Sequence, residues 1–208
     1  MFLLPKIALI DYKAGNLTSV RKALAAVGAD VFTPDTPRDL ADAQGIIVPG
    51  VGHFAATAAL DGDWVDAILE RVGEGRPLLG ICLGLQWLYE GSEESPELKG
   101  LGVLGGTCLR LRGGTDAGQN IKVPHVGWNS LERIGDAPIV EGVPDAAQVY
   151  FTHSYVAPVT RDTAAATTHG ERFASIVQRG QVAGVQFHPE KSGDVGLQIL
   201  RNYMKMVG

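Results

Sequence analysis

The stretch Pro77–Gln86, PLLGICLGLQ, joins an apolar run to a cysteine that stands between two glycines and precedes a helical pattern. The run Leu78–Ile81 is apolar on both faces, which is typical of a central strand in a parallel sheet. Flanking glycines let the backbone turn sharply at Cys82 and hold its side chain above the sheet, as in the nucleophile elbow of hydrolases. At a helix N-terminus the helix dipole favours the thiolate, and the N–H of Leu83 would face an oxyanion. The stretch predicts a nucleophilic cysteine, with a buried cysteine in a tight turn as the alternative.

Strands and helices alternate around this stretch over the first half of the chain. Apolar runs predict strands at residues 7–10, 31–33, 45–48 and 77–81, and apolar residues at helical spacing predict helices over 17–27 and 65–72. Gly28 suits the end of the first helix. After Tyr89, short β-type runs are predicted at 149–156 and in a hairpin of 173–177 with 182–187, between loop-like segments at 91–106 and 113–120. A last helix is predicted over 197–206.

This order of elements predicts the α/β fold class. We expect a single three-layer domain over residues 1–208, with a mostly parallel central sheet and helices on both faces. We expect an additional mixed or antiparallel β part in the second half. No internal repeat, charge block or linker divides the chain.

Composition and charge exclude several classes of protein. The chain is 45% hydrophobic and 20% charged, which indicates a soluble folded protein, and no apolar run approaches the roughly 20 residues of a membrane helix. A net charge of −5 without a basic tract argues against nucleic acid as a partner. The first residues show no basic segment and no small-residue cleavage site, so we expect no export signal and a cytoplasmic protein. The 27 glycines in 208 residues, nearly twice the usual share of roughly 7%, indicate tight turns and close backbone approaches.

The two cysteines show no metal-binding pattern. They form no Cys-x-x-Cys pair and have no histidine at zinc-finger spacing, so we expect no metal site. Cys108 is expected to be a buried small side chain. A disulfide between Cys82 and Cys108 is not excluded by their spacing, although a cytosolic chain normally keeps its thiols reduced.

His188 has the position expected of a base for Cys82. It ends the apolar run Val182–Phe187 and precedes Pro189, which favours an extended conformation at His188. Side chains two residues apart in an extended chain project to the same side, so Glu190 can fix the imidazole tautomer and stabilise the imidazolium. We predict a triad of Cys82, His188 and Glu190. A strand end capped by a polar turn is the alternative for this segment.

A second glycine motif, Gly50–Ala55 (GVGHFA), matches the dinucleotide-binding fingerprint. Two predicted strands precede it, however, although the fingerprint belongs to the first strand of such a domain. Glu70, about 20 residues further on, lies in a helical pattern and not at the strand end where a ribose contact is expected. We therefore expect no dinucleotide, and we expect this loop to supply a second backbone donor to the oxyanion beside Cys82.

Taken together, three motifs resemble those of the class I glutamine amidotransferases, in the same order and at similar separations. They are GICLGLQ at 80–86, PGVG at 49–52 and HPE at 188–190. Within that class, further segments are similar to the glutaminase subunits of imidazole glycerol phosphate synthases, which act in histidine biosynthesis. These segments are DYKAGNL at 11–17, VPHVGWN at 123–129, YFTHSY at 150–155 and GVQFHPEKS at 184–192. The likeness covers nearly the whole chain.

The resemblance implies a reaction and a set of site residues. Cys82 would attack the side-chain amide carbon of L-glutamine, His188 would pass a proton to the leaving ammonia, and water would hydrolyse the glutamyl thioester. The implied oxyanion donors are the N–H groups of Leu83 and of Gly52 or Val51. The implied substrate contacts are Gln86, Ser154, Tyr155 and Gly50, of which Gln86 lies one helical turn after Cys82. The resemblance implies no cofactor and no metal.

The resemblance also implies a partner chain. This partner is a cyclase subunit, a (β/α)8 barrel, which takes the ammonia directly and makes imidazole glycerol phosphate and an aminoimidazole carboxamide ribotide. In such a heterodimer Asn16, Trp128, Tyr150 and Lys191 would lie at the interface, with Tyr150 and Lys191 near the ammonia exit. A core aromatic and a solvated charge are the alternatives for Trp128 and Lys191. We expect low glutaminase activity from the chain without this partner.

Other functions remain open at this point. A glutaminase subunit of another amidotransferase, such as anthranilate synthase, would share the triad but is expected to lack Pro124–Asn129 and Lys191–Ser192 in this form. A cysteine peptidase or related hydrolase on a similar sheet is disfavoured by Gln86 and by the His-Pro-Glu triplet. A non-catalytic binding module would leave the three triad residues without a purpose.

Overall fold

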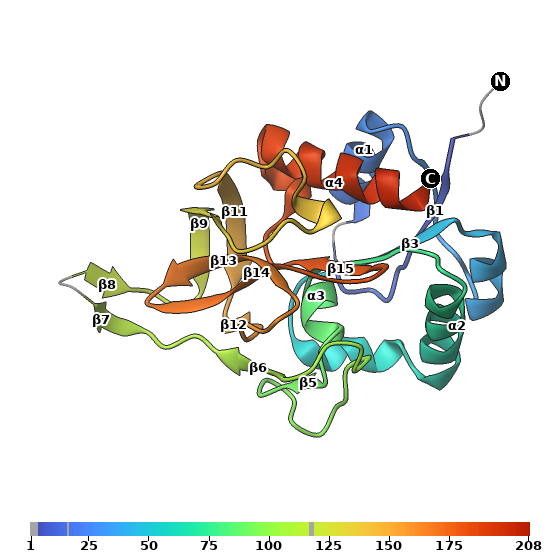
Figure 1. Ribbon diagram of the computed structural model, residues 1–208. Coiled ribbons are helices and arrows are strands. Elements are labelled where there is room, and N and C mark those ends of the chain that lie inside the picture. Colours follow the sequence, from blue (N-terminus) through green and yellow to red (C-terminus); the bar gives the residue numbers. More distant parts are fainter. Residues whose placement is uncertain (1–3, 16, 117–118) are drawn as a thin grey trace.

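The computed structural model describes residues 4–15, 17–116 and 119–208, and an eight-stranded sheet crosses it in the order β10-β13-β14-β15-β4-β3-β1-β2 (Figure 1). The neighbours from β2 to β15 pair in parallel: β2 (Asp30–Phe32), β1 (Lys6–Leu9), β3 (Gly45–Gly50), β4 (Leu78–Cys82) and β15 (Val182–Val185). Antiparallel pairing continues the sheet through β14 (Glu171–Arg179), β13 (Thr163–His169) and β10 (Glu132–Arg133). The predicted mostly parallel sheet is confirmed.

Helices cover both faces of this sheet, as expected. On one face lie α1 (Leu17–Ala26) and α4 (Gly193–Val207), and on the other lie α2 (Gly62–Gly73) and α3 (Leu83–Trp87) (Figure 1). The side chains of β4 point alternately into the two core layers. Leu79 and Ile81 pack with α1 and α4, whereas Leu78 packs with α2 and α3. Burial on both faces explains why the strand reads as a continuous apolar run.

Smaller sheets form the β part that was predicted for the second half. They comprise the pair β9 (His125–Ser130) with β11 (Gln148–His153), the sheet β12 (Tyr155–Val156), β6 (Thr107–Arg110) and β5 (Gly91–Ser92), and the pair β7 (Gly114–Asp116) with β8 (Gln119–Ile121). Short 3-10 helices stand in the connections: η1 (Pro37–Asp42) between β2 and β3, η2 (Phe54–Ala59) between β3 and α2, η3 (Pro138–Val140) between β10 and β11, and η4 (Pro189–Lys191) between β15 and α4. No helix in the described ranges is long and apolar enough to cross a membrane.

Several element boundaries differ from the prediction. The segment 113–120 is not a loop throughout, because β7 and β8 pair from Gly114 with Ile121 to Asp116 with Gln119. This hairpin is held by pairing between the backbones of its two strands. Its side chains are mostly polar or absent, so the sequence lacks the alternation of apolar and polar residues that would predict strands. Strand β5 likewise lies within the predicted loop 91–106, the run 149–156 divides at Ser154, and α4 begins at Gly193. The first helix does end before Gly28, whose φ of 85° is the left-handed conformation that glycine tolerates.

Candidate active site

The turn between β4 and α3 holds Cys82 in a conformation that non-glycine residues rarely adopt. Cys82 ends β4 and caps α3 with φ 54° and ψ −105°. The chain packs closely on both sides of it, since a Cβ atom on Gly80 would run into the backbone of Gly84 and one on Gly84 would run into the carbonyl oxygen of Val48. The predicted elbow is therefore present, and both glycines are required by contact with neighbouring backbone.

His188 and Glu190 form a buried pair at the same edge of the sheet. Strand β15 pairs in parallel with β4, with Val185 opposite Ile81, so the chain after β15 emerges beside Cys82. His188 Nδ1 lies 2.9 Å from Glu190 Oε1, and the two side chains are 3% and 5% exposed. The His188 backbone is extended, with φ −96° and ψ 100°. The extended backbone at His188 agrees with the prediction from the following proline. The residues after it do not continue the extended chain, because Pro189–Lys191 forms the 3-10 helix η4, so Glu190 reaches His188 Nδ1 from within a helical turn.

The electrostatics of the pair favour a protonated imidazole. Burial acts to lower the pKa of His188, but interaction with the neighbouring Cys82 and with Glu190 outweighs burial and raises the pKa to about 9. The buried Nε2 atom of His188 has no hydrogen-bond partner of normal length within the described residues. One nitrogen is thus oriented by a carboxylate while the other is available to carry a proton beside the thiol.

A cavity of about 230 Å³ opens in front of Cys82. It is lined by Gly52, Cys82, Leu83, Gln86, Glu94, Pro124, Thr152, His153, Ser154 and Tyr155. Gln86 is held in its wall, because its Nε2 donates to Tyr155 O at 2.9 Å and to Gln186 Oε1 at 3.2 Å. Cys82 Sγ lies 3.7 Å from Gln186 Nε2. The structure thus brings together six residues that the sequence predicted: Gly52, Cys82, Leu83, Gln86, Ser154 and Tyr155.

Sequence reasoning missed Glu94, Thr152 and His153, which also line this cavity. Glu94 lies in the irregular stretch after β5, and its Oε2 accepts a 2.7 Å hydrogen bond from the N–H of Phe54. A partly buried carboxylate in a cavity wall can form a charge-assisted hydrogen bond with the ammonium group of a ligand. No periodic pattern marks Glu94, whereas Thr152 and His153 stood inside the quoted segment YFTHSY and could have been proposed with Ser154 and Tyr155.

Gly50 and Val51 do not reach the Cys82 cavity. Both line a separate cavity of about 30 Å³ that also borders His188, Glu190 and Lys191. The N–H of Val51 donates to Ala14 O at 2.9 Å. A Cβ atom on Gly50 would run into the hydroxyl of Tyr12, which explains the glycine there. In this conformation Leu83 and Gly52 line the Cys82 cavity, and the prediction for Val51 requires its peptide group to turn.

Three of the four predicted interface residues lie close together. The rings of Trp128 and Tyr150 meet edge to face with centroids 6.0 Å apart, and Lys191 Nζ lies 5.8 Å from the Tyr150 ring centre. Trp128 is 56% exposed, which rules out the core aromatic considered for it. The predicted contact Asn16 lies outside the described residues.

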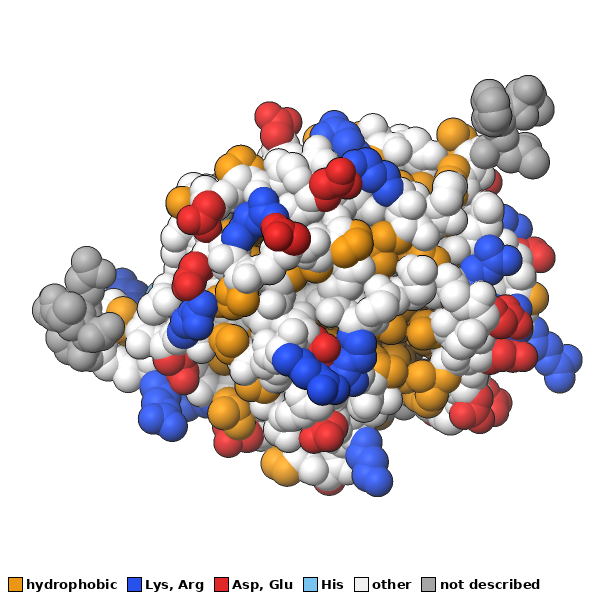
Figure 2. Space-filling model, in the orientation of Figure 1, with side chains coloured by type: hydrophobic (Ala, Val, Ile, Leu, Met, Phe, Trp, Pro, Cys, Tyr) orange, Lys and Arg blue, Asp and Glu red, His pale blue; other side chains and the backbone are white. Residues whose placement is uncertain are grey.

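Surface charge, Cys108 and the possible metal ligands among the described residues supply no competing site. Figure 2 shows a face on which acidic and basic side chains are interspersed, without a continuous basic area. Cys108 is fully buried, burial raises the pKa of its thiol, and both cysteines are free. Among the described residues, no group of three or more His, Cys, Asp and Glu side chains is arranged to hold a metal ion.

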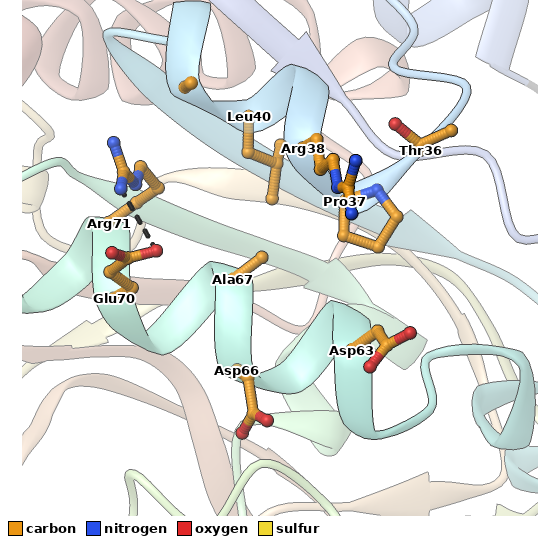
Figure 3. Close-up of a pocket in the computed structure, with 10 residues that line it drawn as sticks. Thr36, Pro37, Arg38, Leu40, Asp63, Asp66, Ala67, Glu70 and Arg71 are labelled. Carbon is orange, nitrogen blue, oxygen red and sulfur yellow. Dashed lines mark ion pairs between the residues drawn. The ribbon is translucent and has the colours of Figure 1, made fainter.

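A larger cavity, of about 730 Å³, lies between η1 and α2 (Figure 3). Its labelled charged residues are Arg38, Asp63, Asp66, Glu70 and Arg71, of which Glu70 and Arg71 form an ion pair at 3.1 Å. It shares no lining residue with the Cys82 cavity and contains neither cysteine nor histidine. The smaller cavity is therefore the candidate active site.

Comparison with known proteins places these features in a family. The model of the family Glutamine amidotransferase class-I matches residues 8–206. The chain is 42% identical to the imidazole glycerol phosphate synthase subunit HisH of Geobacillus sp. (strain WCH70), with 97% of each chain covered. It is 43% identical to the protein of the same name from Thermococcus kodakarensis, covering 96% of this chain and 100% of the relative.

Solved structures show the same fold at lower identity. A crystal structure of a glutamine amidotransferase matches with a TM-score of 0.73 at 22% identity, covering 97% of this chain and 98% of the other. The structure of PurLQS from Thermotoga maritima matches with a TM-score of 0.70 at 18% identity, covering 99% of this chain and 100% of the matched chain. The three-layer fold is thereby confirmed.

Proposed function

The chain belongs to the glutamine amidotransferase class-I family, and from this premise we propose that it is the glutaminase subunit of an imidazole glycerol phosphate synthase. It hydrolyses L-glutamine to glutamate and ammonia. Residues 1–208 form a single glutaminase domain in this proposal. The proposal rests on the buried His188–Glu190 pair, whose imidazole interacts with Cys82, and on the cavity that opens on the other side of this cysteine. Relatives that are 42% and 45% identical over 97% of the chain are named imidazole glycerol phosphate synthase subunit HisH, which supports this proposal.

The proposed reaction follows from the positions of these atoms. The Cys82 thiolate attacks the side-chain amide carbon of glutamine, and backbone N–H groups of Leu83 and Gly52 stabilise the oxyanion. His188 donates its Nε2 proton to the departing nitrogen, which leaves as ammonia. Water then attacks the thioester with His188 as base, and glutamate and the thiolate are released. Glu190 keeps the imidazole in the required tautomer through Nδ1.

The cavity fits a small polar substrate. At about 230 Å³ it is smaller than the roughly 300–1,000 Å³ of typical ligand pockets, which suits a single amino acid. We assign the carboxylate of Glu94 to the α-ammonium group of glutamine, since it is the acidic residue in the lining. The Gln86 amide and the backbone at Ser154 and Tyr155 complete the contacts.

The product requires a partner. Ammonia that escapes into water at neutral pH becomes protonated and loses its nucleophilic lone pair, so direct transfer preserves its reactivity. We propose that the surface of Trp128, Tyr150 and Lys191 contacts a cyclase (β/α)8-barrel subunit in a cytoplasmic heterodimer. The small cavity bordered by His188, Glu190 and Lys191 supports an exit at this side of the triad.

The deciding experiment measures glutamate release with and without the barrel subunit and its ligand. We expect slow release by the chain alone and strong stimulation in the complex. Cys82→Ala should abolish glutamate release, while the complex still makes imidazole glycerol phosphate from added ammonium. Cys108→Ala is the matched control, because Cys108 is the other buried thiol and lies outside the cavity. Normal glutaminase turnover by Cys82→Ala would refute the mechanism, and stimulation by a different synthase subunit would reassign the pathway.

A further inference from the structure

A line of buried and partly buried hydrogen bonds leads from strand β9 to the candidate active site, and the mechanism above does not use it. Asn129 Nδ2 lies 3.3 Å from His125 Nε2. His125 Nδ1 lies 3.2 Å from His153 Nε2, where β9 and β11 pair directly. His153 Nδ1 lies 3.1 Å from Tyr155 O. The two histidines are 3% and 7% exposed, so the middle of this line is shielded from solvent, whereas Asn129 at its outer end is partly exposed.

The partners at each end determine where every proton lies. A carbonyl oxygen only accepts, so His153 Nδ1 carries a proton and donates it to Tyr155 O. A neutral ring has one bare nitrogen, so His153 Nε2 accepts from His125 Nδ1–H. At the other end, Asn129 Oδ1 accepts the N–H of Ser130 at 2.8 Å, so its Nδ2 must face His125 Nε2 and Thr168 O. Each nitrogen in the line therefore has one compatible partner.

Both rings are neutral in this arrangement. Burial, assisted by the neighbouring His169, lowers the pKa of His125 to about 4. Burial, assisted by His125, lowers the pKa of His153 to about 3, and His169 and His188 act in the same direction. A second proton on His153 Nε2 would face the N–H of His125, and one on His125 Nε2 would face the Asn129 amide, so each would place two donors opposite each other. The hydrogen-bond geometry and the lowered pKa values therefore both indicate neutral rings.

Ring packing prevents the line from rearranging. The His125 ring stacks on Phe151 on one side, with centroids 4.7 Å apart, and on His169 on the other, with centroids 4.0 Å apart. His169 is itself held, since its Nε2 lies 2.8 Å from Lys122 O. The His125 ring is thus clamped between two planes and keeps its direction.

The line ends on the residue that positions Gln86. Tyr155 O accepts from His153 Nδ1 and also from Gln86 Nε2, and both side chains line the Cys82 cavity. At its other end, Asn129 is adjacent in sequence to Trp128, which lies opposite Tyr150 in the pairing of β9 and β11. The line therefore connects the strand pair that bears the proposed partner surface with the wall of the substrate cavity.

We propose that Asn129, His125 and His153 are positioning residues that hold the Tyr155 carbonyl, and through it the Gln86 amide, at the place where glutamine binds. This inference rests on the proposed glutaminase function. Asn129 and His125 are absent from the cavity lining, so they act on the substrate only through the hydrogen bonds that follow them. Their loss affects binding of glutamine more than the chemical step.

The first test is Asn129→Asp in the complex with the barrel subunit. The carboxylate presents an acceptor to His125 Nε2, which draws a proton onto that atom and reverses the line. We expect KM for glutamine to rise about tenfold with kcat within about twofold of wild type. In a Gln86→Ala background the same substitution should raise KM clearly less than in the wild-type background, because part of the effect passes through Gln86. An unchanged KM in folded Asn129→Asp, or additive effects of the two substitutions, would overturn the proposal.

Thr167→Val is the matched control. Thr167 Oγ1 donates to Ser130 O at 2.9 Å and accepts from Ser175 Oγ at 2.6 Å, so it belongs to a buried polar chain close to Asn129 that does not lead to the cavity. We expect it to lower the urea midpoint of unfolding without changing KM. If Thr167→Val raised KM as much as Asn129→Asp, any weakening of this region would disturb the site. That result would count against a specific role for the hydrogen bonds from Asn129 to Tyr155.

A second measurement needs neither a folded variant nor an active enzyme. Imidazole 15N NMR of the wild-type chain at pH 7 should show protons on Nδ1 and bare Nε2 atoms for both His125 and His153. A proton on Nε2 of either ring would refute the proposal. If the wild-type complex released no glutamate, the proposed function would fail, and this spectrum would still decide the hydrogen-bond line.

Discussion

The N–H of Val51 donates a 2.9 Å hydrogen bond to the carbonyl oxygen of Ala14, and so it is not offered to an oxyanion at Cys82. Val51 stands between Gly50 and Gly52, and Gly52 has a φ of 97°. A peptide group flanked by glycines can turn with little steric resistance. Because the Cys82 elbow and the His188–Glu190 pair are already assembled, this peptide group is the part of the proposed site that is not yet in place.

Val51→Pro tests whether this peptide group becomes an oxyanion donor in the active complex. Proline removes the N–H. If the group turns toward the cavity on activation, kcat of the stimulated complex should fall about 10²–10³-fold, the usual effect of losing one oxyanion donor. Steady-state glutamate release in the presence of the barrel subunit and its ligand measures this. A kcat close to wild type would show that Leu83 and Gly52 suffice.

Glu190→Gln tests the orientation of the base. The amide can still accept a hydrogen bond from His188 Nδ1, but it no longer stabilises the imidazolium by charge. We expect kcat to fall about tenfold or more, and the pKa of His188 to move down from about 9 when it is followed by NMR.

Cys82→Ser supplies the comparison for that titration. Interaction with Cys82 is, after the opposing effect of burial, the largest influence on the pKa of His188, so this variant should lower the pKa as well. A His188 pKa that stayed near 9 in both variants would show that neither neighbour determines the charge of the ring.

Gly84→Ala tests the packing of the elbow. A Cβ atom at this position would run into the carbonyl oxygen of Val48, which belongs to the adjacent strand and cannot move away cheaply. Overpacking of this kind costs about 1–3 kcal/mol, and we expect a loss at the upper end together with loss of glutaminase activity. Urea unfolding followed by circular dichroism measures the stability.

Gly73→Ala is the control for that substitution. Gly73 ends α2 and a Cβ atom there would meet nothing within 4 Å. Since alanine restricts the unfolded chain more than glycine does, this change should be neutral or stabilising by about 0.4–1 kcal/mol. Equal destabilisation by both substitutions would remove the argument from close packing.

Local sequence patterns were sufficient to predict the parallel sheet and the triad. The apolar run before Cys82 and the glycines around it specify a strand, a sharp turn and a helix within ten residues. The proline between His188 and Glu190 favours the extended backbone that His188 has, although the residues after His188 form η4 and not an extended chain. Both motifs follow parallel neighbouring strands, so the fold brings their ends to one edge of the sheet.

The rest of the site depends on contacts between residues far apart in the chain. His125 meets His153 only because β9 and β11 pair in one register, which no local pattern specifies. Glu94 reaches the cavity from a stretch with no periodicity, fixed by hydrogen bonds such as that from Phe54. The hydrogen bond from Val51 to Ala14 likewise follows from tertiary packing, whereas the sequence predicted only that this glycine loop supplies a donor to the oxyanion.

Acid should weaken the fold through His125 and His153, and the sign follows from their titration. Their folded pKa values of about 4 and about 3 lie below the ordinary value of 6.5, so between these limits the unfolded chain binds more protons than the folded one. Stability is therefore complete above about pH 6.5 and is lost as the pH falls toward 4 and then 3. His169, stacked on His125, and His188, near His153, are the ionisable groups that act on the pair.

The measurement compares the free energy of unfolding at pH 7.5 and pH 5 in wild type and in His153→Asn. Asparagine keeps a donor for Tyr155 O in the place of Nδ1 but does not titrate. The variant should lose less stability than wild type on acidification, because unfolding then takes up about one proton fewer in this range. Equal losses would show that His153 has a normal pKa in the folded chain, so its hydrogen-bond partners would not hold the ring neutral in acid, as the line from Asn129 to Tyr155 requires.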